Sequence, residues 1–282
     1  MNMFAAIISL GSLGCIAALL LAMAARRFAV TVDPRQVALL EVLAGANCGA
    51  CGYPGCDAYA RALLAGNAKP DLCRPGGAET LARIAAILGI EATPRQPQIA
   101  VVRCRGNRQM ARAKYDYQGL QDCRAAQKLA FGPKLCPSGC LGLGSCVQHC
   151  PFGALSINSV GLAVVNRDRC TGCGLCVSIC PRQVLTLAPA VAQTHVLCNS
   201  HDTAAKVKKY CDAGCLGCRL CVKAAPDSFI MDDALAVVRY GHEDPATMAS
   251  AIDRCPHHCI ETFAAGGETV APAPATTKGT GS

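Results

Sequence analysis

Residues 170–181 read Cys-Thr-Gly-Cys-Gly-Leu-Cys-Val-Ser-Ile-Cys-Pro. The four cysteines of this stretch are Cys170, Cys173, Cys176 and Cys180. Their spacing, C-x2-C-x2-C-x3-C-P, is typical of chains that bind 4Fe-4S clusters through thiolate sulfurs. Three thiolates on one short loop with glycines can each ligate a different iron of one cubane, while backbone N-H groups point at its sulfides. The stretch therefore predicts a fold built around iron-sulfur clusters.

The fourth cysteine of such a run is expected to begin a helix and to ligate a second cluster, which predicts a partner run. A related pattern, C-x3-C-x5-C-x3-C-P, lies just upstream in residues 136–151, with Leu143 where a middle cysteine would stand. Cys136 is available as the substitute, so we assign one cluster to Cys136, Cys140, Cys146 and Cys180. The other cluster is assigned to Cys150, Cys170, Cys173 and Cys176.

The chain has 22 cysteines in 282 residues, and disulfides or zinc sites are the alternatives to clusters. A chain of this length can bury an adequate core without cross-links. Cysteines two or three residues apart seldom meet disulfide geometry, and zinc sites usually come as two separated pairs. The bunched cysteines therefore favour iron-sulfur clusters and a reducing compartment.

A run of 23 residues without charge, 3–25, precedes Arg26 and Arg27. At about 1.5 Å per residue it is long enough to span a hydrocarbon layer roughly 30 Å thick. A cleaved signal peptide or a lipidation site is the alternative, but both need a basic segment before the apolar run. The two arginines after the run predict a single-pass anchor with the rest of the chain on the cytoplasmic side of a bacterial inner membrane.

The formal net charge is +8, but clusters with four thiolates would offset it. Aromatic residues make up 4% of the chain and tryptophan is absent, so stacking platforms for bases are not indicated. Nucleic-acid binding is therefore not expected. Basic residues near the cluster loops could offset cluster charge or attract an acidic partner, although most are expected to be solvated: Arg167, Arg169, Arg182, Lys206, Lys208 and Lys209.

A separate cysteine group follows the anchor with the spacing C-x2-C-x4-C-x16-C. Its members are Cys48, Cys51, Cys56 and Cys73. Glycines and a proline between them indicate a loop that can surround a cluster, and helices are expected over 34–44, 57–65 and 78–88. We expect a small helical 4Fe-4S domain, with zinc as the alternative, and a linker over 94–97.

Strands are expected over 154–157, 162–165 and 184–187, which gives the two-fold repeat of a small ferredoxin-like domain. Between residues 101 and 136 the sequence is less informative. Cys104 and Cys123 have no obvious cluster there, and they are interpreted either as buried thiols or as a redox pair or alternate ligand set.

A third cysteine run has Ala225 in place of the fourth cysteine, as in single-cluster ferredoxins that read C-x2-C-x2-C-x3-A-P-D-x-F. Those proteins take the last ligand from a distant Cys-Pro, so the ligands expected here are Cys215, Cys218, Cys221 and Cys255. A strand is expected over 234–240 and a helix over 245–252, while His257 and His258 are expected at the surface. Three cysteines stay unassigned in this region: Cys198, Cys211 and Cys259.

These observations predict an α+β chain in five parts. They are an anchor over 1–27, a helical 4Fe-4S domain over 28–93, a two-cluster ferredoxin-like domain over 94–190, a single-cluster ferredoxin-like domain over 191–265 and a disordered tail over 266–282.

Several motifs resemble those of the B subunits of Rnf electron-transport complexes, over nearly the whole chain before the tail. They are the apolar N-terminal helix, Asn-Cys-Gly-Ala-Cys-Gly-Tyr-Pro-Gly-Cys at 47–56, Lys-Tyr-Asp-Tyr at 114–117, Asp122-Cys123, Gly-Pro-Lys at 132–134, and residues 140–146 and 170–182. The resemblance implies a membrane complex that exchanges electrons between ferredoxin and NAD and couples the transfer to sodium or proton translocation.

By this resemblance the chain is an oxidoreductase subunit that takes electrons from soluble ferredoxin and passes them through 4Fe-4S clusters to membrane and flavin subunits. No catalytic residue is expected on this chain. The NAD and flavin sites are expected on other chains, because this one has no G-x-G-x-x-G motif that opens a helix after a strand. Ala225 and the missing second motif near Cys255 imply one cluster fewer than in longer relatives, so four clusters are expected.

Two other functions stay open. One is reductive activation of a corrinoid protein, whose activators share the Cys48–Cys73 type of module. The other is reduction of a redox-sensing regulator. A purely structural zinc protein is the third alternative.

Overall fold

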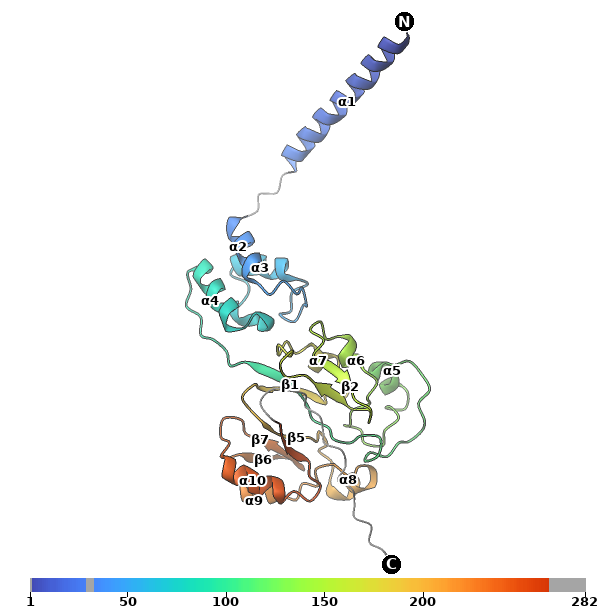
Figure 1. The fold of residues 1–282 in the computed structure, drawn as a ribbon, viewed down its shortest axis with the longest axis vertical. Coiled ribbons are helices and arrows are strands. Elements are labelled where there is room, and N and C mark those ends of the chain that lie inside the picture. The colour runs from blue at the N-terminus through green and yellow to red at the C-terminus, as the bar shows by residue number, and fades with distance from the viewer. Residues whose placement is uncertain (1, 29–32, 264–282) are drawn as a thin grey trace, which may run out of the picture.

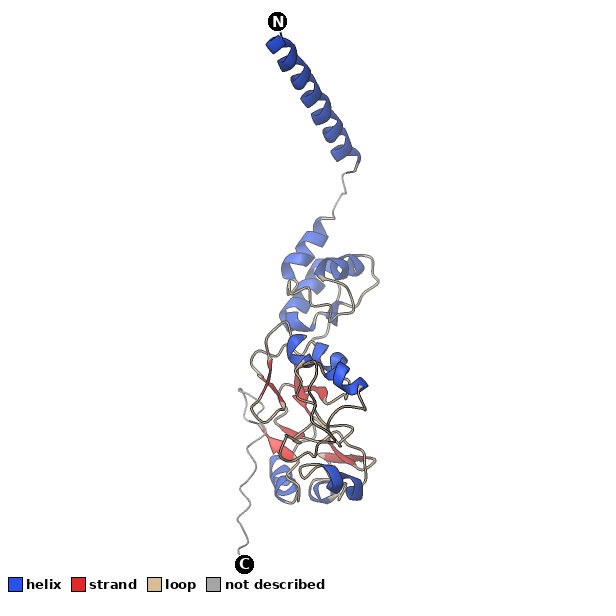
Figure 2. Ribbon diagram, turned by 90° about the vertical axis from the view of Figure 1, so that its right-hand side faces the viewer, coloured by secondary structure: helices blue, strands red, loops and turns tan. Residues whose placement is uncertain are grey.

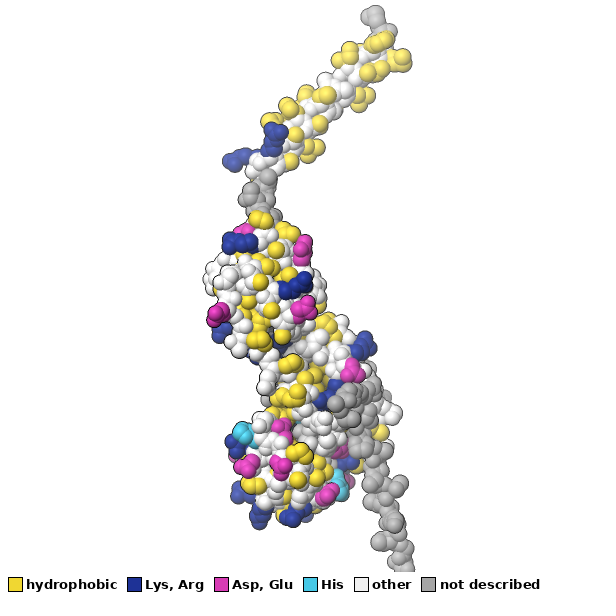
Figure 3. Space-filling view, turned by 60° about the vertical axis from the view of Figure 1, so that its left-hand side comes forward, with side chains coloured by type: hydrophobic (Ala, Val, Ile, Leu, Met, Phe, Trp, Pro, Cys, Tyr) yellow, Lys and Arg dark blue, Asp and Glu magenta, His cyan; other side chains and the backbone are white. Residues whose placement is uncertain are grey.

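The computed structural model describes residues 2–28 and 33–263. The first element, α1 (Asn2–Arg27), is a long helix that stands apart from the other elements (Figure 1). Apolar side chains cover its surface, and Lys and Arg colouring appears at its C-terminal end (Figure 3). It is the one helix in the described residues that is long and apolar enough to cross a membrane. The tail predicted over 266–282 lies outside the described residues.

Three helices and two short 3-10 turns form the next unit. The helices are α2 (Pro34–Val42), α3 (Cys56–Leu64) and α4 (Gly77–Leu88), and the turns are η1 (Pro70–Leu72) and η2 (Arg74–Gly76). The side chain of Asp33 caps α2 by accepting the N-H of Arg35, and Gly89 ends α4 in a left-handed conformation. The three helices predicted here are confirmed, with ends shifted by one or two residues. Their shared core contains Leu39, Tyr59 and Ile84, all fully buried.

The central unit contains two antiparallel pairs of strands. β1 (Gln98–Val102) pairs with β4 (Leu185–Pro189), and β2 (Leu155–Ile157) pairs with β3 (Ala163–Val165). Its helices are short: α5 (Cys123–Lys128), α6 (Ser145–Gln148) and α7 (Leu175–Ile179). β1 was not predicted, since a run of four apolar residues, 99–102, has no partner visible in the sequence.

One local expectation is wrong. The cysteine before each proline does not begin a helix, because α6 ends before Cys150 and α7 ends with Cys180 as its C-cap. The helices instead begin inside the cysteine run, directly after Gly144 and Gly174. Proline cannot continue a helix beyond its first turn, so the Cys-Pro pair marks the end of each one.

The C-terminal unit repeats this architecture. β5 (Thr194–Val196) pairs with β8 (Ile260–Thr262), and β6 (Phe229–Asp232) pairs with β7 (Leu235–Val238). Its helices are α8 (Ala204–Tyr210), α9 (Leu220–Ala224) and α10 (Pro245–Asp253). The strand predicted over 234–240 and the helix over 245–252 are present, whereas β5, β6 and β8 were not predicted. Figure 2 shows the strands gathered in the lower part of the molecule, below the helical unit.

Removal of residues 1–28 is expected to move the protein from the membrane fraction to the soluble fraction without changing its iron content. The large apolar side chains of α1 are exposed, so the rest of the fold does not depend on them. Iron per chain in each fraction after anaerobic lysis is the measurement. A matched control replaces Leu13 and Leu20 by Ala, which keeps the helix apolar and should keep the protein in the membrane. Loss of iron on truncation would contradict the expectation.

Candidate functional site: groups of cysteines along the fold

Three loops carry the cysteine runs, and they share one backbone conformation. Each has a glycine with a positive φ: Gly142 at +72°, Gly172 at +65° and Gly217 at +64°. A Cβ at any of them would collide with a backbone carbonyl of a neighbouring segment. The loops therefore lie directly on the backbone of a strand or hairpin, which only glycine allows.

The shared conformation aligns the three runs residue by residue. Two positions after each of these glycines a residue with positive φ precedes the short helix: Gly144, Gly174 and Arg219. The position between is Leu143 in the first run, Cys173 in the second and Cys218 in the third. The structure thus places Leu143 where a middle cysteine stands in the other two loops.

The predicted group Cys150, Cys170, Cys173 and Cys176 is brought together. All four line one small cavity with Gly172 and Gly174. Backbone N-H groups point at two of the sulfurs: that of Ala100 lies 3.3 Å from Cys170 Sγ, and that of Ala154 lies 3.4 Å from Cys150 Sγ. Donors of this kind stabilise thiolates bound to iron and tune the potential of a cluster.

The group around Cys146 differs from the sequence-based assignment. Burial raises the pKa of Cys146, and the thiolates of Cys140, Cys123 and Cys180 raise it further. Cys123 begins α5, and its N-H donates to Ser145 Oγ at 2.6 Å, next to Cys146 in the sequence. The thiolates that raise the pKa of Cys136 are instead those of Cys104 and Cys211. Cys123, 17 positions before Cys140 in the sequence, lies near this group, and no spacing rule indicated it.

The predicted group in the helical unit is also brought together. Burial raises the pKa of Cys73, and the thiolates of Cys56 and Cys48 raise it further. Cys51, Cys56 and Cys73 pack against the core of α2, α3 and α4. The Tyr59 hydroxyl donates to the Lys69 carbonyl at 2.7 Å and so holds the segment that leads to Cys73.

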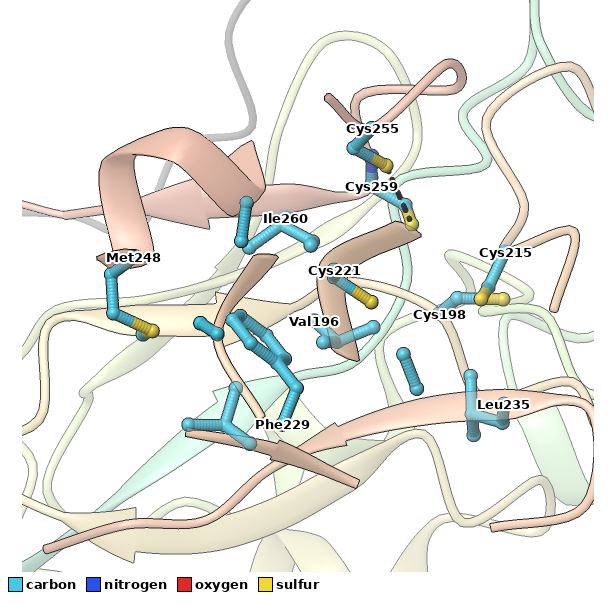
Figure 4. Packing of buried hydrophobic residues seen from close by; sticks show 14 residues of the cluster. Val196, Cys198, Cys215, Cys221, Phe229, Leu235, Met248, Cys255, Cys259 and Ile260 are labelled. Atoms are coloured by element: carbon cyan, nitrogen blue, oxygen red, sulfur yellow. Dashed lines mark hydrogen bonds between the residues drawn. The ribbon is translucent and has the colours of Figure 1, made fainter. Parts of the chain in front are cut away.

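The C-terminal group contains the four predicted cysteines and one more. One small cavity is lined by Cys215, Cys218, Cys221, Cys255 and Cys259. Cys259 Sγ lies 3.5 Å from Cys255 Sγ (Figure 4). Hydrogen bonding with the Cys259 side chain lowers the pKa of Cys215 to about 6 and that of Cys255 to about 5.

A comparison within the chain distinguishes Cys255 from Cys259. The N-H of Cys259 donates to Cys255 Sγ at 3.4 Å, as the N-H of Ala154 donates to Cys150 Sγ at the same distance. Cys255 thus matches the proline-flanked cysteine Cys150, whereas Cys259 matches Ala154, a buried apolar position. Cys259 is accordingly a core residue beside the group.

Neighbouring groups lie close to one another along the molecule. The thiolate of Cys48 is among the charges that raise the pKa of Cys173, and Cys73 and Cys170 line a common cleft of about 330 Å³. Further along, Cys176 is one of the thiolates that raise the pKa of Cys146. The cysteines of the helical unit thus lie next to those of the Cys170 loop, and these in turn lie next to those of the Cys140 loop.

The spread of the cysteines bears on the zinc alternative. Four thiolates on one tetrahedral zinc, with Zn-S bonds of about 2.3 Å, would have sulfurs within about 4 Å of one another. Within residues 2–28 and 33–263, the group of three potential ligands that lie within 4.8 Å of one another is the exposed set His201, Asp232 and Asp233. The cysteine groups are wider, as expected where each thiolate binds a separate iron.

The basic residues near the loops divide into two classes, and the expectation that most are solvated is confirmed, since four of the six named from the sequence are exposed. Arg167 and Arg182 are buried, as is Lys134, whereas the others named from the sequence are exposed: Arg169, Lys206, Lys208 and Lys209. The Arg182 guanidinium donates to the backbone carbonyls of Phe131, Cys136 and Gly139. Burial lowers the pKa of Arg182, and the nearby thiolates of Cys136, Cys104 and Cys140 oppose that effect.

Arg182→Gln is expected to shift the midpoint potential of the adjacent clusters to more negative values, by on the order of tens of millivolts, because a buried positive charge favours the reduced, more negative cluster. An EPR-monitored redox titration measures the shift. Arg169→Gln removes the same charge from an exposed position and should leave the potentials unchanged. Identical midpoint potentials in the two variants would argue against a role of Arg182 in setting the potential of the adjacent clusters.

Comparisons with known families agree with this geometry. Residues 43–75 match the FeS family, described as an Fe-S cluster family, and residues 163–186 match the 4Fe-4S binding domain. Residues 211–262 match the 4Fe-4S single cluster domain of Ferredoxin I. The chain is therefore an iron-sulfur protein with 4Fe-4S clusters.

Similar proteins cover almost the whole chain. The B subunit of the ion-translocating oxidoreductase complex of Methanosarcina acetivorans is 40% identical over 89% of this chain and 95% of its own length. The B subunit of the proton-translocating ferredoxin:NAD(+) oxidoreductase complex of Clostridium ljungdahlii is 41% identical over 90% of both chains. The Na(+)-translocating counterpart from Acetobacterium woodii is 38% identical over 89% of this chain and 75% of its own. The chain belongs to the family of Rnf-type ion-translocating oxidoreductase B subunits and is an iron-sulfur electron-transfer subunit.

Proposed function

We propose that this chain accepts electrons from soluble ferredoxin and passes them, one at a time, through its clusters to the membrane and flavin subunits of an Rnf-type complex. In that complex the transfer to NAD would be coupled to movement of sodium ions or protons. The names of the relatives support the reaction. The observation that carries the role of this chain is the succession of cysteine groups, each beside the next, from the helical unit to the central loops.

The proposal includes four ligand sets. They are Cys48, Cys51, Cys56 and Cys73; Cys150, Cys170, Cys173 and Cys176; Cys123, Cys140, Cys146 and Cys180; and Cys215, Cys218, Cys221 and Cys255. The third set replaces Cys136 by Cys123, since Cys123 lies beside Cys146. We propose that these sets belong to three domains, over 28–93, 94–190 and 191–265.

A bound cluster supplies reversible one-electron storage, and the chain's residues set its conditions. The thiolates would hold the irons, and backbone N-H groups such as that of Ala100 would stabilise the charge on sulfur. Because Cys146 and Cys176 are buried, water would be kept away from irons bound to them. The buried guanidinium of Arg182 offsets negative charge where two groups approach each other.

We also propose that α1 is a single-pass anchor in the cytoplasmic membrane, with the cluster-bearing units on the cytoplasmic side. Arg26 and Arg27 at the C-terminal end of α1 support this orientation, because basic residues remain in the cytoplasm. Soluble ferredoxin and reduced thiols are both found in that compartment, so the orientation agrees with the proposed donor and with the cysteine chemistry.

The test mixes the anaerobically purified full chain with reduced ferredoxin and follows cluster absorbance by stopped-flow spectroscopy. Rapid bleaching, with EPR signals of reduced cubanes, is expected. The Cys48→Ser, Cys51→Ser double variant should lose about four irons and serves to locate the entry site. Absence of iron, or clusters that ferredoxin cannot reduce, would rule out the proposal.

A strain that lacks the gene distinguishes this role from the alternative. Loss of ferredoxin-dependent NAD reduction in that strain would support the proposal, whereas a changed stress response alone would favour reduction of a regulator.

Cys123→Ser and Cys146→Ser are each expected to lower the iron content by about four per chain, and the double variant by no more than either alone. Both thiols would ligate the same cluster, so the losses cannot add. Iron per chain on anaerobically purified protein is the measurement, and Cys15→Ser, in α1, is the control. Full iron content in Cys123→Ser would return Cys136 to this ligand set.

A further inference from the structure

Four buried cysteines outside the proposed ligand sets converge where the central and C-terminal units meet. They are Cys104, Cys136, Cys198 and Cys211, with exposed fractions of 9%, 7%, 7% and 6%. Cys104 follows β1, Cys198 follows β5 and Cys211 ends α8, so distant parts of the sequence supply them. The Arg105 N-H donates to the Leu197 carbonyl at 3.1 Å and joins the segments of Cys104 and Cys198.

Two glycines show how close three of the sulfurs are. A Cβ at Gly106 would lie 3.1 Å from Cys211 Sγ and 3.7 Å from Cys104 Sγ. A Cβ at Gly139 would lie 3.4 Å from Cys136 Sγ and 3.9 Å from Cys104 Sγ. Cys104 Sγ thus lies near both partners, and the missing side chains of the glycines leave room between the sulfurs. Cys104 also lies close enough to Cys198 and Cys211 for a charge on its sulfur to act on theirs.

A backbone N-H lies close to each of the four sulfurs. Cys104 Sγ accepts that of Cys140 at 3.3 Å, and the sulfurs of Cys136, Cys198 and Cys211 lie near the N-H groups of the residues two positions later, Ser138, Ser200 and Ala213. The same turn occurs within the cluster loops, where Cys173 accepts from Leu175 and Cys215 from Gly217. Ordinary buried thiols do not require such a set of donors, whereas thiolates do.

Two buried cations lie at this place, and the acceptors of their hydrogen bonds are uncharged: backbone carbonyls and, for Arg182, also Gln127 Oε1. Lys134 is 7% exposed, and its ammonium donates to the Gly106 carbonyl at 2.6 Å. Arg182 donates to the carbonyls of Cys136 and Gly139. No carboxylate in residues 2–28 and 33–263 forms an ion pair with either cation. Buried charges are normally paired, and a cubane with four thiolates carries about two negative charges.

We infer that Cys104, Cys136, Cys198 and Cys211 ligate a fifth 4Fe-4S cluster. Assembly would deprotonate the four thiols, releasing four protons as the sulfur-iron bonds form. The site adjoins the groups on both sides, because Cys140 donates to Cys104 Sγ and the Cys215 N-H donates to Cys198 (Figure 4 shows Cys198 and Cys215 side by side). The role of this cluster rests on the proposed function. The cluster would accept one electron from a reduced neighbouring cluster, which is thereby oxidised, and would then reduce the next cluster.

Iron and sulfide per chain of the anaerobically purified full-length protein test the inference without any variant. About twenty irons are expected, whereas about sixteen would overturn the fifth cluster and leave the four-cluster proposal intact. Absence of iron would instead defeat the proposed function. The two failures are therefore distinguishable.

Variants then locate the ligands. Cys198→Ser and Cys211→Ser should each lose about four irons, and Cys136→Ser with Cys211→Ser should also lose about four. Cys136→Ser with Cys146→Ser should lose about eight, since the two thiols would serve different clusters. A loss of about four in this last pair, with full iron in Cys211→Ser, would overturn the assignment. Cys15→Ser is the control for loss of one thiol, and EPR of the remaining clusters reports whether they are intact.

Discussion

The fold depends on close contact between the cysteine loops and the backbone beneath them. At Gly142, Gly172 and Gly217 the loop lies so near a carbonyl group that no Cβ fits. This contact fixes the direction in which the following N-H groups and thiols point, and it turns the chain into a short helix at once. The strand pairs beneath are short, with three to five residues each, so neither the sheets nor the helices alone provide a large core. Thiolates bound to clusters would supply the missing cross-links between segments.

Close spacing of the cysteine groups is the second constraint on the molecule. A relay needs each cluster near the next, and the cleft between Cys73 and Cys170 is one such junction. Thiolate groups placed side by side would, however, repel one another in a medium of low dielectric constant. Arg182 and Lys134 are buried among them, held by backbone carbonyls, and provide fixed positive charge between neighbouring groups. Part of the formal net charge of +8 thus comes from cations that are buried beside the cysteine groups.

The sequence by itself determined the chemistry, the main helices and most of the cysteine groups. Ligands on one loop, such as Cys170, Cys173 and Cys176, are recognisable because a cubane demands their spacing. The apolar run of α1 and the helices α2, α3, α4 and α10 follow from composition and periodicity over enough residues. Strands of three residues, such as β5 and β8, were not predictable, because their stability comes from a partner far away in the sequence.

Only the tertiary structure decided the grouping of cysteines from different segments. Cys123 approaches Cys146, and Cys136 approaches Cys104 and Cys211, although spacing favoured Cys136 as the ligand beside Cys140. The burial of Arg182 was equally hidden, because the loop that encloses it is 43 to 51 positions away. The physical reason is common to these cases: a thiolate or a charge is stabilised by what surrounds it in space, and local sequence records only neighbours along the chain.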